Sequence, residues 1–190
     1  MQSAAGAFDR IGARLDSERV AGLLGRDAGS RVTKTFVFTD IVDSTRTAEA
    51  LGDAKWTKAL RWHDDTLRAI FRANEGEVVD HTGDGFFVAF DDPERAVDAA
   101  VAIQRALDAN GLSPDVRIGL HSAEATSLSA NYRGKGVHAA ARIGALAGAG
   151  EIVASRETVA ALRGVRAAEA RTVELKGLSE PVEIVSVAWR

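Results

Sequence analysis

The composition of this 190-residue chain is that of an ordinary globular protein, with 46% hydrophobic and 27% charged residues. The length suits one domain with a short appendage. A net charge of −3 argues against nucleic acid as a partner, and the absence of cysteine excludes disulfides and thiolate metal sites. No apolar run approaches membrane-spanning length and no signal peptide is evident, so we expect a cytoplasmic protein that makes no membrane contact.

Residues 1–30 differ from the rest and predict an N-terminal helical extension that ends in a linker. Phe8, Ile11 and Leu15 recur at helical spacing, and the run Asp27–Ser30 has the composition of a linker. Such an arm either packs on the domain or contacts a partner subunit or a regulatory module. Residues 31–190 are expected to form the folded domain.

The stretch Lys34–Thr45, KTFVFTDIVDST, places a carboxylate at the end of a buried strand. The strand formers Phe36-Val37-Phe38 come first, and after Asp40 the chain turns into a helix. A hard-metal ligand therefore lies beside the free N–H groups of a helix start, as a metal-bound triphosphate requires. The alternative is that Asp40 is a plain turn residue.

The stretch Gly76–Asp91, GEVVDHTGDGFFVAFD, predicts a β-hairpin. Two strand-like runs flank Gly83-Asp84-Gly85, which is a strong turn signal. A tight hairpin directs Asp84 outward from the sheet. Asp40 and Asp84, on two neighbouring strand ends, could then share one pair of Mg²⁺ or Mn²⁺ ions.

The remaining pattern alternates helices with strands and hairpins. We expect helices over about 45–74, 93–109, 137–147 and 155–162, strands over 116–120 and 151–154, a polar loop over 124–136, and a terminal hairpin over 171–187. Hairpins interspersed with helices predict an α+β sandwich with a mainly antiparallel sheet.

These motifs resemble the catalytic domain of class III nucleotidyl cyclases. FTDIVDST is followed some forty residues later by TGDGFFVAF, and the resemblance continues through RIGLH at 117–121, GVHAAARIGALA at 136–147 and LKG at 175–177. It covers roughly residues 33–190. It implies a ferredoxin-like sandwich covered by helices, with residues 31–190 as the catalytic domain.

The resemblance also implies a head-to-tail homodimer with catalytic sites at the subunit interface. One subunit would supply Asp40, Asp84 and the Ile41 carbonyl for two Mg²⁺ or Mn²⁺ ions. The helix start formed by Val42, Asp43, Ser44 and Thr45 would bind the triphosphate. The ribose 3′-hydroxyl would attack the α-phosphate in line and release pyrophosphate.

The opposite subunit is expected to supply the cationic residues. Arg142 stands where the family places the arginine that stabilises charge on the reacting phosphate, a role that suits a planar fork of donors. His138, four residues earlier, replaces the usual ribose-orienting asparagine. Lys176 would contact the triphosphate, or would be only a charged residue of the terminal hairpin.

The base-recognition positions depart from the family pattern. The adenine-reading lysine, four residues before Asp84, is replaced by Asp80, and its aspartate partner, seven residues before His138, by Asn131. Adenine can be read with the two roles exchanged. Guanine fits as simply, with Asp80 accepting from N1–H and N2–H and Asn131 donating to O6. Guanylyl cyclases of the family carry a glutamate at the lysine position.

We therefore predict a purine nucleotidyl cyclase that converts ATP to 3′,5′-cyclic AMP, with ATP favoured because adenylyl cyclases are the commoner bacterial members. One alternative is a guanylyl cyclase acting on GTP. Another is a cyclase-like module that binds nucleotide with little turnover, as the exchanges at Asp80, Asn131 and His138 would suggest. A polymerase-like enzyme that joins two nucleotides is disfavoured by the helix that carries Arg142.

Overall fold

The computed structural model describes residues 29–111, 114–129, 131–178 and 180–190. Apart from its last two residues, the helical extension predicted over residues 1–30 lies outside this part of the chain. Among the helices of the described ranges, none has the length and apolarity that a membrane crossing demands.

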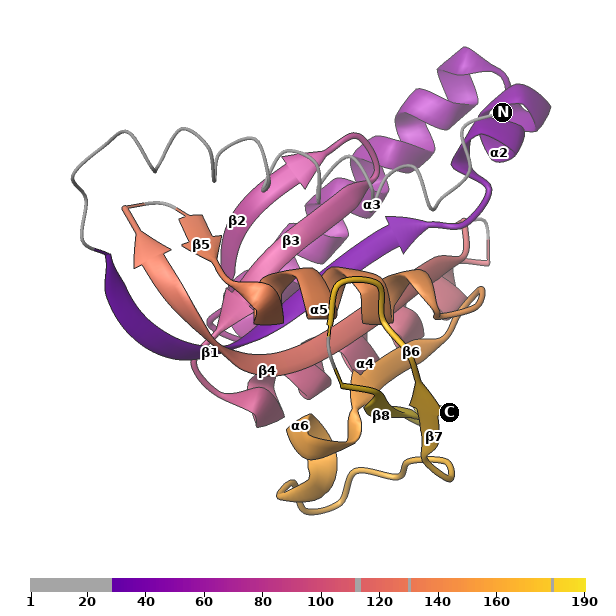
Figure 1. The fold of residues 1–190 in the computed structure, drawn as a ribbon. Helices are drawn as coiled ribbons and strands as arrows, with labels where there is room; N and C mark the ends of the chain where they lie inside the picture. Colours follow the sequence, from indigo (N-terminus) through magenta and orange to yellow (C-terminus); the bar gives the residue numbers. More distant parts are fainter. Residues whose placement is uncertain (1–28, 112–113, 130, 179) are drawn as a thin grey trace.

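One eight-stranded sheet forms the centre of the described chain (Figure 1). The strands are β1 (Ser30–Ile41), β2 (Glu77–Thr82), β3 (Gly85–Phe90), β4 (Val116–Leu128), β5 (Asn131–Arg133), β6 (Ile152–Ser155), β7 (Arg171–Val173) and β8 (Val182–Ser186). The helices are α2 (Ser44–Leu51), α3 (Asp53–Ala73), α4 (Pro93–Asn110), α5 (Lys135–Ala145) and α6 (Arg156–Ala160).

The order of the strands confirms the predicted α+β architecture. The sheet runs β2-β3-β1-β4-β6-β8-β7, and β5 pairs with β4 off this path. The first four strands thus follow the ferredoxin-like order β4-β1-β3-β2, in which both pairings of β1 are antiparallel. Only the β4–β6 pairing among the described strands is parallel, so the sheet is mainly antiparallel.

Alternation of side chains along β1 divides the core between two faces of the sheet. Val37 belongs to a core with Phe71 of α3 and with the apolar residues of α4. Phe36 and Phe38 point the other way and pack with Ala140 of α5. Helices α3 and α4 therefore cover one face and α5 covers the other (Figure 1).

Helix α5 lies close to β4 because two glycines face each other. A Cβ added at Gly119 would lie 2.2 Å from the Cα of Gly144, a separation that real Cβ atoms do not reach. Position 119 therefore requires a residue without a side chain for this approach. The contact fixes how α5, with His138 and Arg142, sits on the sheet.

Two predicted elements were wrong in detail. The helix expected over 45–74 is two helices, because the backbone turns at Gly52 (φ 75°, ψ 156°), whose N–H bonds the carbonyl of Ala48 and ends α2. The polar loop expected over 124–136 instead continues β4 and forms β5. Its Ala- and Ser-rich sequence has low strand propensity, but pairing with β1, from Ser30 opposite Ser127 onward, overrides it.

Substitution of Gly119 by alanine should destabilise the fold by about 1–3 kcal/mol, because the added methyl group overpacks the α5–β4 contact. The free energy of unfolding, measured in urea, checks this. Gly148→Ala is the matched control: its Cβ would meet only the Glu151 carboxylate, at 3.4 Å, and should change stability by less than about 0.5 kcal/mol. Equal unfolding midpoints for the two variants would contradict this account of α5.

Candidate active site

The predicted hairpin turn is present between β2 and β3. Thr82 pairs with Gly85, so Gly83 and Asp84 form a two-residue turn. Gly83 has a φ of +67°, as the first central residue of a type II′ turn requires. Asp84, the second turn residue, is half-buried.

Asp40 lies at the end of β1, directly against this turn. Phe86 donates its N–H to Thr39 Oγ1 at 3.2 Å. A Cβ added at Gly85 would lie 2.8 Å from the Thr39 carbonyl oxygen and 3.8 Å from Oδ1 of Asp40. The neighbour of Asp84 in sequence therefore contacts the end of β1. The structure brings the two predicted carboxylates, Asp40 and Asp84, to the same part of the sheet.

Arg117 binds the Asp40 carboxylate and was not among the predicted site residues. Its Nε and Nη2 donate to Oδ2 of Asp40 at 3.0 and 2.6 Å. Both residues are buried, with 2% of Asp40 and 9% of Arg117 exposed. The sequence did carry a signal: a charged residue between Val116 and Ile118 in a buried strand needs an oppositely charged partner.

The turn after β1 leaves a helix start without a side-chain cap. Val42 donates its N–H to the carbonyl of Asp115 at 2.8 Å. Asp43 adopts a left-handed conformation (φ 51°), caps no N–H with its side chain, and precedes a first turn that holds no acidic residue. The backbone N–H groups of Ser44 and Thr45 thus lie at the start of α2, where they can donate to an anion. Ile41 is buried in the core beneath this turn.

A second group of predicted residues lies on α5 and the terminal hairpin. His138 and Arg142 are one helical turn apart and both are half-buried. A Cβ added at Gly177 would lie 3.5 and 3.6 Å from Nη1 and Nη2 of Arg142. The loop that carries Lys176 therefore packs on the Arg142 guanidinium.

The carboxylates and the cations lie on different elements. Asp40 and Asp84 lie on β1 and the β2–β3 hairpin, whereas Arg142 lies on α5 and contacts the loop between β7 and β8. Helix α5 itself packs on Phe36 and Phe38 of β1. We refer to Asp40 and Asp84 as the carboxylate half of the candidate site and to the cations of α5 and the β7–β8 loop as its cationic half.

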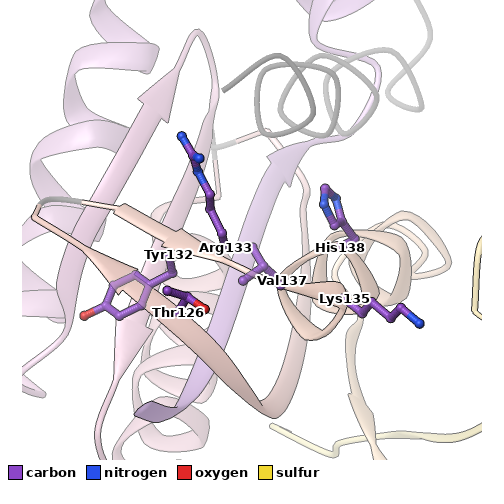
Figure 2. Close-up of a pocket in the computed structure, with 7 residues that line it drawn as sticks. Thr126, Tyr132, Arg133, Lys135, Val137 and His138 are labelled. Carbon is purple, nitrogen blue, oxygen red and sulfur yellow. The ribbon is translucent and has the colours of Figure 1, made fainter. Parts of the chain in front are cut away.

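A cavity of about 270 Å³ opens beside the N-terminus of α5 (Figure 2). Arg133 and His138 extend in the same direction from its wall, while Lys135 points another way. Gly134, the N-cap residue of α5, has no side chain to cap the helix, and the first turn of α5 holds no acidic residue. Within the described part of the chain, the buried Nε of Arg133 has no hydrogen-bond partner. This cavity therefore suits a ligand group that accepts hydrogen bonds or carries negative charge. Arg133 was not among the predicted site residues.

The two predicted base-recognition residues lie on β2 and β5. Asp80 Oδ1 accepts the N–H of His81 at 2.9 Å, and Asn131 Oδ1 accepts the N–H of Tyr132 at 2.7 Å. Tyr132 also donates its hydroxyl to Glu77 of β2 at 2.6 Å, which ties the two strands together. Asn131 adjoins Tyr132 and Arg133, which line the cavity.

Among the described residues, no group of three or more His, Cys, Asp or Glu side chains could hold a metal ion. Asp40 and Asp84 form a pair of carboxylates, and their oxygens are the hard ligands that Mg²⁺ and Mn²⁺ prefer. Mg²⁺ is commonly held by one or two carboxylates together with substrate phosphates and water. The donor set therefore fits a metal–triphosphate better than a metal bound by protein alone.

His121, at the middle of β4, contacts the start of α6. Its Nδ1 lies 2.9 Å from Ser155 Oγ, which in turn lies 2.7 Å from Thr158 Oγ1. Burial lowers the pKa of His121, and the nearby Glu157 carboxylate opposes this shift. The contact joins β4 to the start of α6.

Comparison with known proteins identifies the class. Residues 29–187 match the family model described as the adenylate and guanylate cyclase catalytic domain. The chain therefore belongs to this family, as its motifs predicted.

Similar proteins include both kinds of cyclase. The guanylyl cyclase Cya2 is 28% identical with a TM-score of 0.75, over 84% of this chain and 93% of that one. The adenylyl cyclase CyaB from P. aeruginosa shares the fold at 23% identity, with a TM-score of 0.75 over 85% of this chain and 96% of that one. An uncharacterised protein of Mycobacterium tuberculosis is 29% identical over 191 residues, 95% of this chain and 50% of the relative. The chain thus spans about half the length of the curated relatives it matches first.

The pKa shift of His121 predicts a pH dependence of stability. Because the folded state lowers this pKa below its unfolded value of about 6.5, protons bind the unfolded chain more readily. The free energy of unfolding should therefore fall as the pH drops below about 6.5. His121→Gln, which keeps a polar group for Ser155, should lose this part of the dependence. Urea unfolding at about pH 7 and pH 5 tests this. If the free energy of unfolding falls by the same amount between the two pH values in wild type and His121→Gln, the prediction is contradicted.

Proposed function

We propose that the protein is a nucleotidyl cyclase that converts ATP to 3′,5′-cyclic AMP and pyrophosphate at the interface of a head-to-tail homodimer. The observation that carries the proposal is the position of Asp40: a buried carboxylate at a strand end, against the turn that bears Asp84. Membership of the cyclase family supplies the reaction class.

Asp40, Asp84 and the carbonyl of Ile41 would hold the metal ions. When bound, two Mg²⁺ or Mn²⁺ ions neutralise the triphosphate and make the ribose 3′-hydroxyl more acidic. Groups of the protein itself would bind and orient the nucleotide. The uncapped N–H groups at the start of α2 bind phosphate oxygens, and the left-handed turn at Asp43 aims them.

Arg142 would act from the second subunit. Its guanidinium, which lies against the Gly177 loop, would donate to the α-phosphate as charge develops on the phosphate oxygens. Lys176 on the same loop would neutralise the triphosphate, and His138 would donate one hydrogen bond to the ribose. In a two-fold pairing, the carboxylates of each subunit would meet these cations of the other subunit, and the dimer would hold two sites.

GTP is the second candidate substrate, and Asp80 favours it. Its carboxylate, when ionised, only accepts hydrogen bonds, and guanine presents N1–H and N2–H as donors where adenine presents one amine. The cavity carrying Arg133 beside Asn131 would suit guanine O6 and N7, which are acceptors that arginine binds as a fork. ATP remains the first candidate because Asp80 and Asn131 can also read adenine with exchanged roles.

A turnover assay tests the proposal. The purified protein should form a 3′,5′-cyclic nucleotide and pyrophosphate from ATP or GTP with Mn²⁺, and the preferred base assigns the substrate. Asp40→Asn should lower kcat by at least about 10²–10³-fold, because the site loses a charged metal ligand. Asp98→Asn, an exposed aspartate on α4, is the matched control and should behave as wild type.

Two outcomes separate the enzyme from a binding module. Nucleotide binding without any cyclic product, in a folded dimer, would overturn the enzyme proposal and favour a module that binds without turnover. Activity that survives Asp40→Asn would overturn the assignment of the metal site.

A further inference from the structure

We propose that Tyr132 is a positioning residue for base recognition. Its hydrogen bond to Glu77 joins strand β5 to strand β2, and thereby sets the spacing between Asn131 and Asp80. The inference rests on the proposed function, in which those two side chains read the purine base. It deepens that function by naming the contact on which the preference between ATP and GTP depends.

The Tyr132 side chain anchors β5 across the sheet. Strand β5 has three residues and, among the described strands, pairs with β4 only, which holds a strand weakly. Tyr132 is 5% exposed, and its ring lies 5.5 Å from that of Phe36 on β1. Its hydroxyl donates to Oε2 of Glu77 at 2.6 Å. Because β3 and β1 separate β2 from β4 in the strand order, this bond links strands that are not neighbours.

The position of Asn131 follows from that of Tyr132. Tyr132 packs in the core on the α5 face of the sheet, whereas Arg133 extends in another direction from the wall of the cavity (Figure 2). Residues two apart on a strand point the same way, so Asn131 shares the direction of Arg133. Asn131 Oδ1 also accepts the N–H of Tyr132 at 2.7 Å. A shift of the Tyr132 ring would therefore move the Asn131 amide.

A β-bulge in β2 brings Asp80 to the face of the sheet on which Tyr132 packs. Val78 lies opposite Val88 of β3. Two residues later, Asp80 lies opposite Phe87, so the register has shifted by one residue. Residues directly opposite each other share a face of the sheet, and Phe87 belongs to the core on the α5 face. The bulge therefore directs Asp80 to that face, three residues after Glu77.

The charges around the Tyr132 hydroxyl keep it a hydrogen-bond donor. Burial raises the pKa of Tyr132 and so does the Glu77 carboxylate, whereas Lys34 opposes the shift. The Lys34 ammonium lies 5.8 Å from the centre of the tyrosine ring and 2.7 Å from Oδ1 of Asp91. The hydroxyl thus keeps its proton at neutral pH and donates to a charged acceptor, which strengthens the bond. Glu77 is exposed, so water can solvate its carboxylate when the hydroxyl is removed.

Tyr132→Phe removes the hydroxyl and keeps the packing of the ring. Dissociation constants of the full chain for α,β-methylene-ATP and α,β-methylene-GTP, each with Mn²⁺, are measured by calorimetry. We expect the ratio of the two constants to move toward one by about two- to tenfold, as loss of one hydrogen bond implies. Glu77→Ala should have the same effect, and the double variant should show no further change, because both substitutions remove one contact. A general loosening of the fold would weaken both nucleotides alike.

Two controls isolate the contact. Glu77→Gln keeps an acceptor for the tyrosine hydroxyl and should retain the wild-type ratio. Glu183→Ala removes another exposed strand glutamate, which pairs with Arg156 at 3.1 Å, and should also retain it. The wild-type ratio in Tyr132→Phe would overturn the proposal, as would equal affinity of wild type for the two analogues.

The same measurement separates this inference from the proposed function. Because neither analogue needs to react, a wild type that binds one analogue more tightly but forms no cyclic product would refute the proposed function and still decide the role of Tyr132. Binding of neither analogue would overturn both.

Discussion

The ion pair between Asp40 and Arg117 is the constraint on which the carboxylate half of the site depends. It joins β1 to β4 at the point where β1 ends, and it places a carboxylate in a position with 2% exposure. Without a cation nearby, this position would be unfavourable for Asp40. The start of α2 and the β2–β3 turn both adjoin that strand end, so the pair also anchors the segment proposed to bind triphosphate.

The cationic half depends on a different constraint, the close packing of α5 on β4. Gly119 and Gly144 let the helix approach the sheet, and this places Arg142 against the Gly177 loop. The carboxylate half lies on β1 and the β2–β3 turn, whereas the cationic half lies on α5 and the β7–β8 loop. The proposed mechanism joins the carboxylate half of one copy of the chain to the cationic half of another.

The sequence predicted features that local chemistry determines. The turn at Gly83-Asp84 and the strand before Asp40 follow from turn and strand propensities, and family motifs supplied the expected roles. Arg117 was missed because strand register brings it to Asp40, and Arg133 was missed because a cavity formed by β4, β5 and α5 surrounds it. The extension of β4 past Leu120 was missed because pairing with β1 outweighs the weak propensity of alanine and serine.

The central claim, that each catalytic site combines the Asp40 half of one copy with the Arg142 half of another, is tested most directly by mixing two inactive variants. Asp40→Asn and Arg142→Gln homodimers should each lack cyclase activity. When the two are unfolded together and refolded as a mixture, half of the dimers are mixed and each holds one intact site, so about a quarter of wild-type activity should return. A mixture as inactive as its components, with mixed dimers shown to form, would contradict the claim.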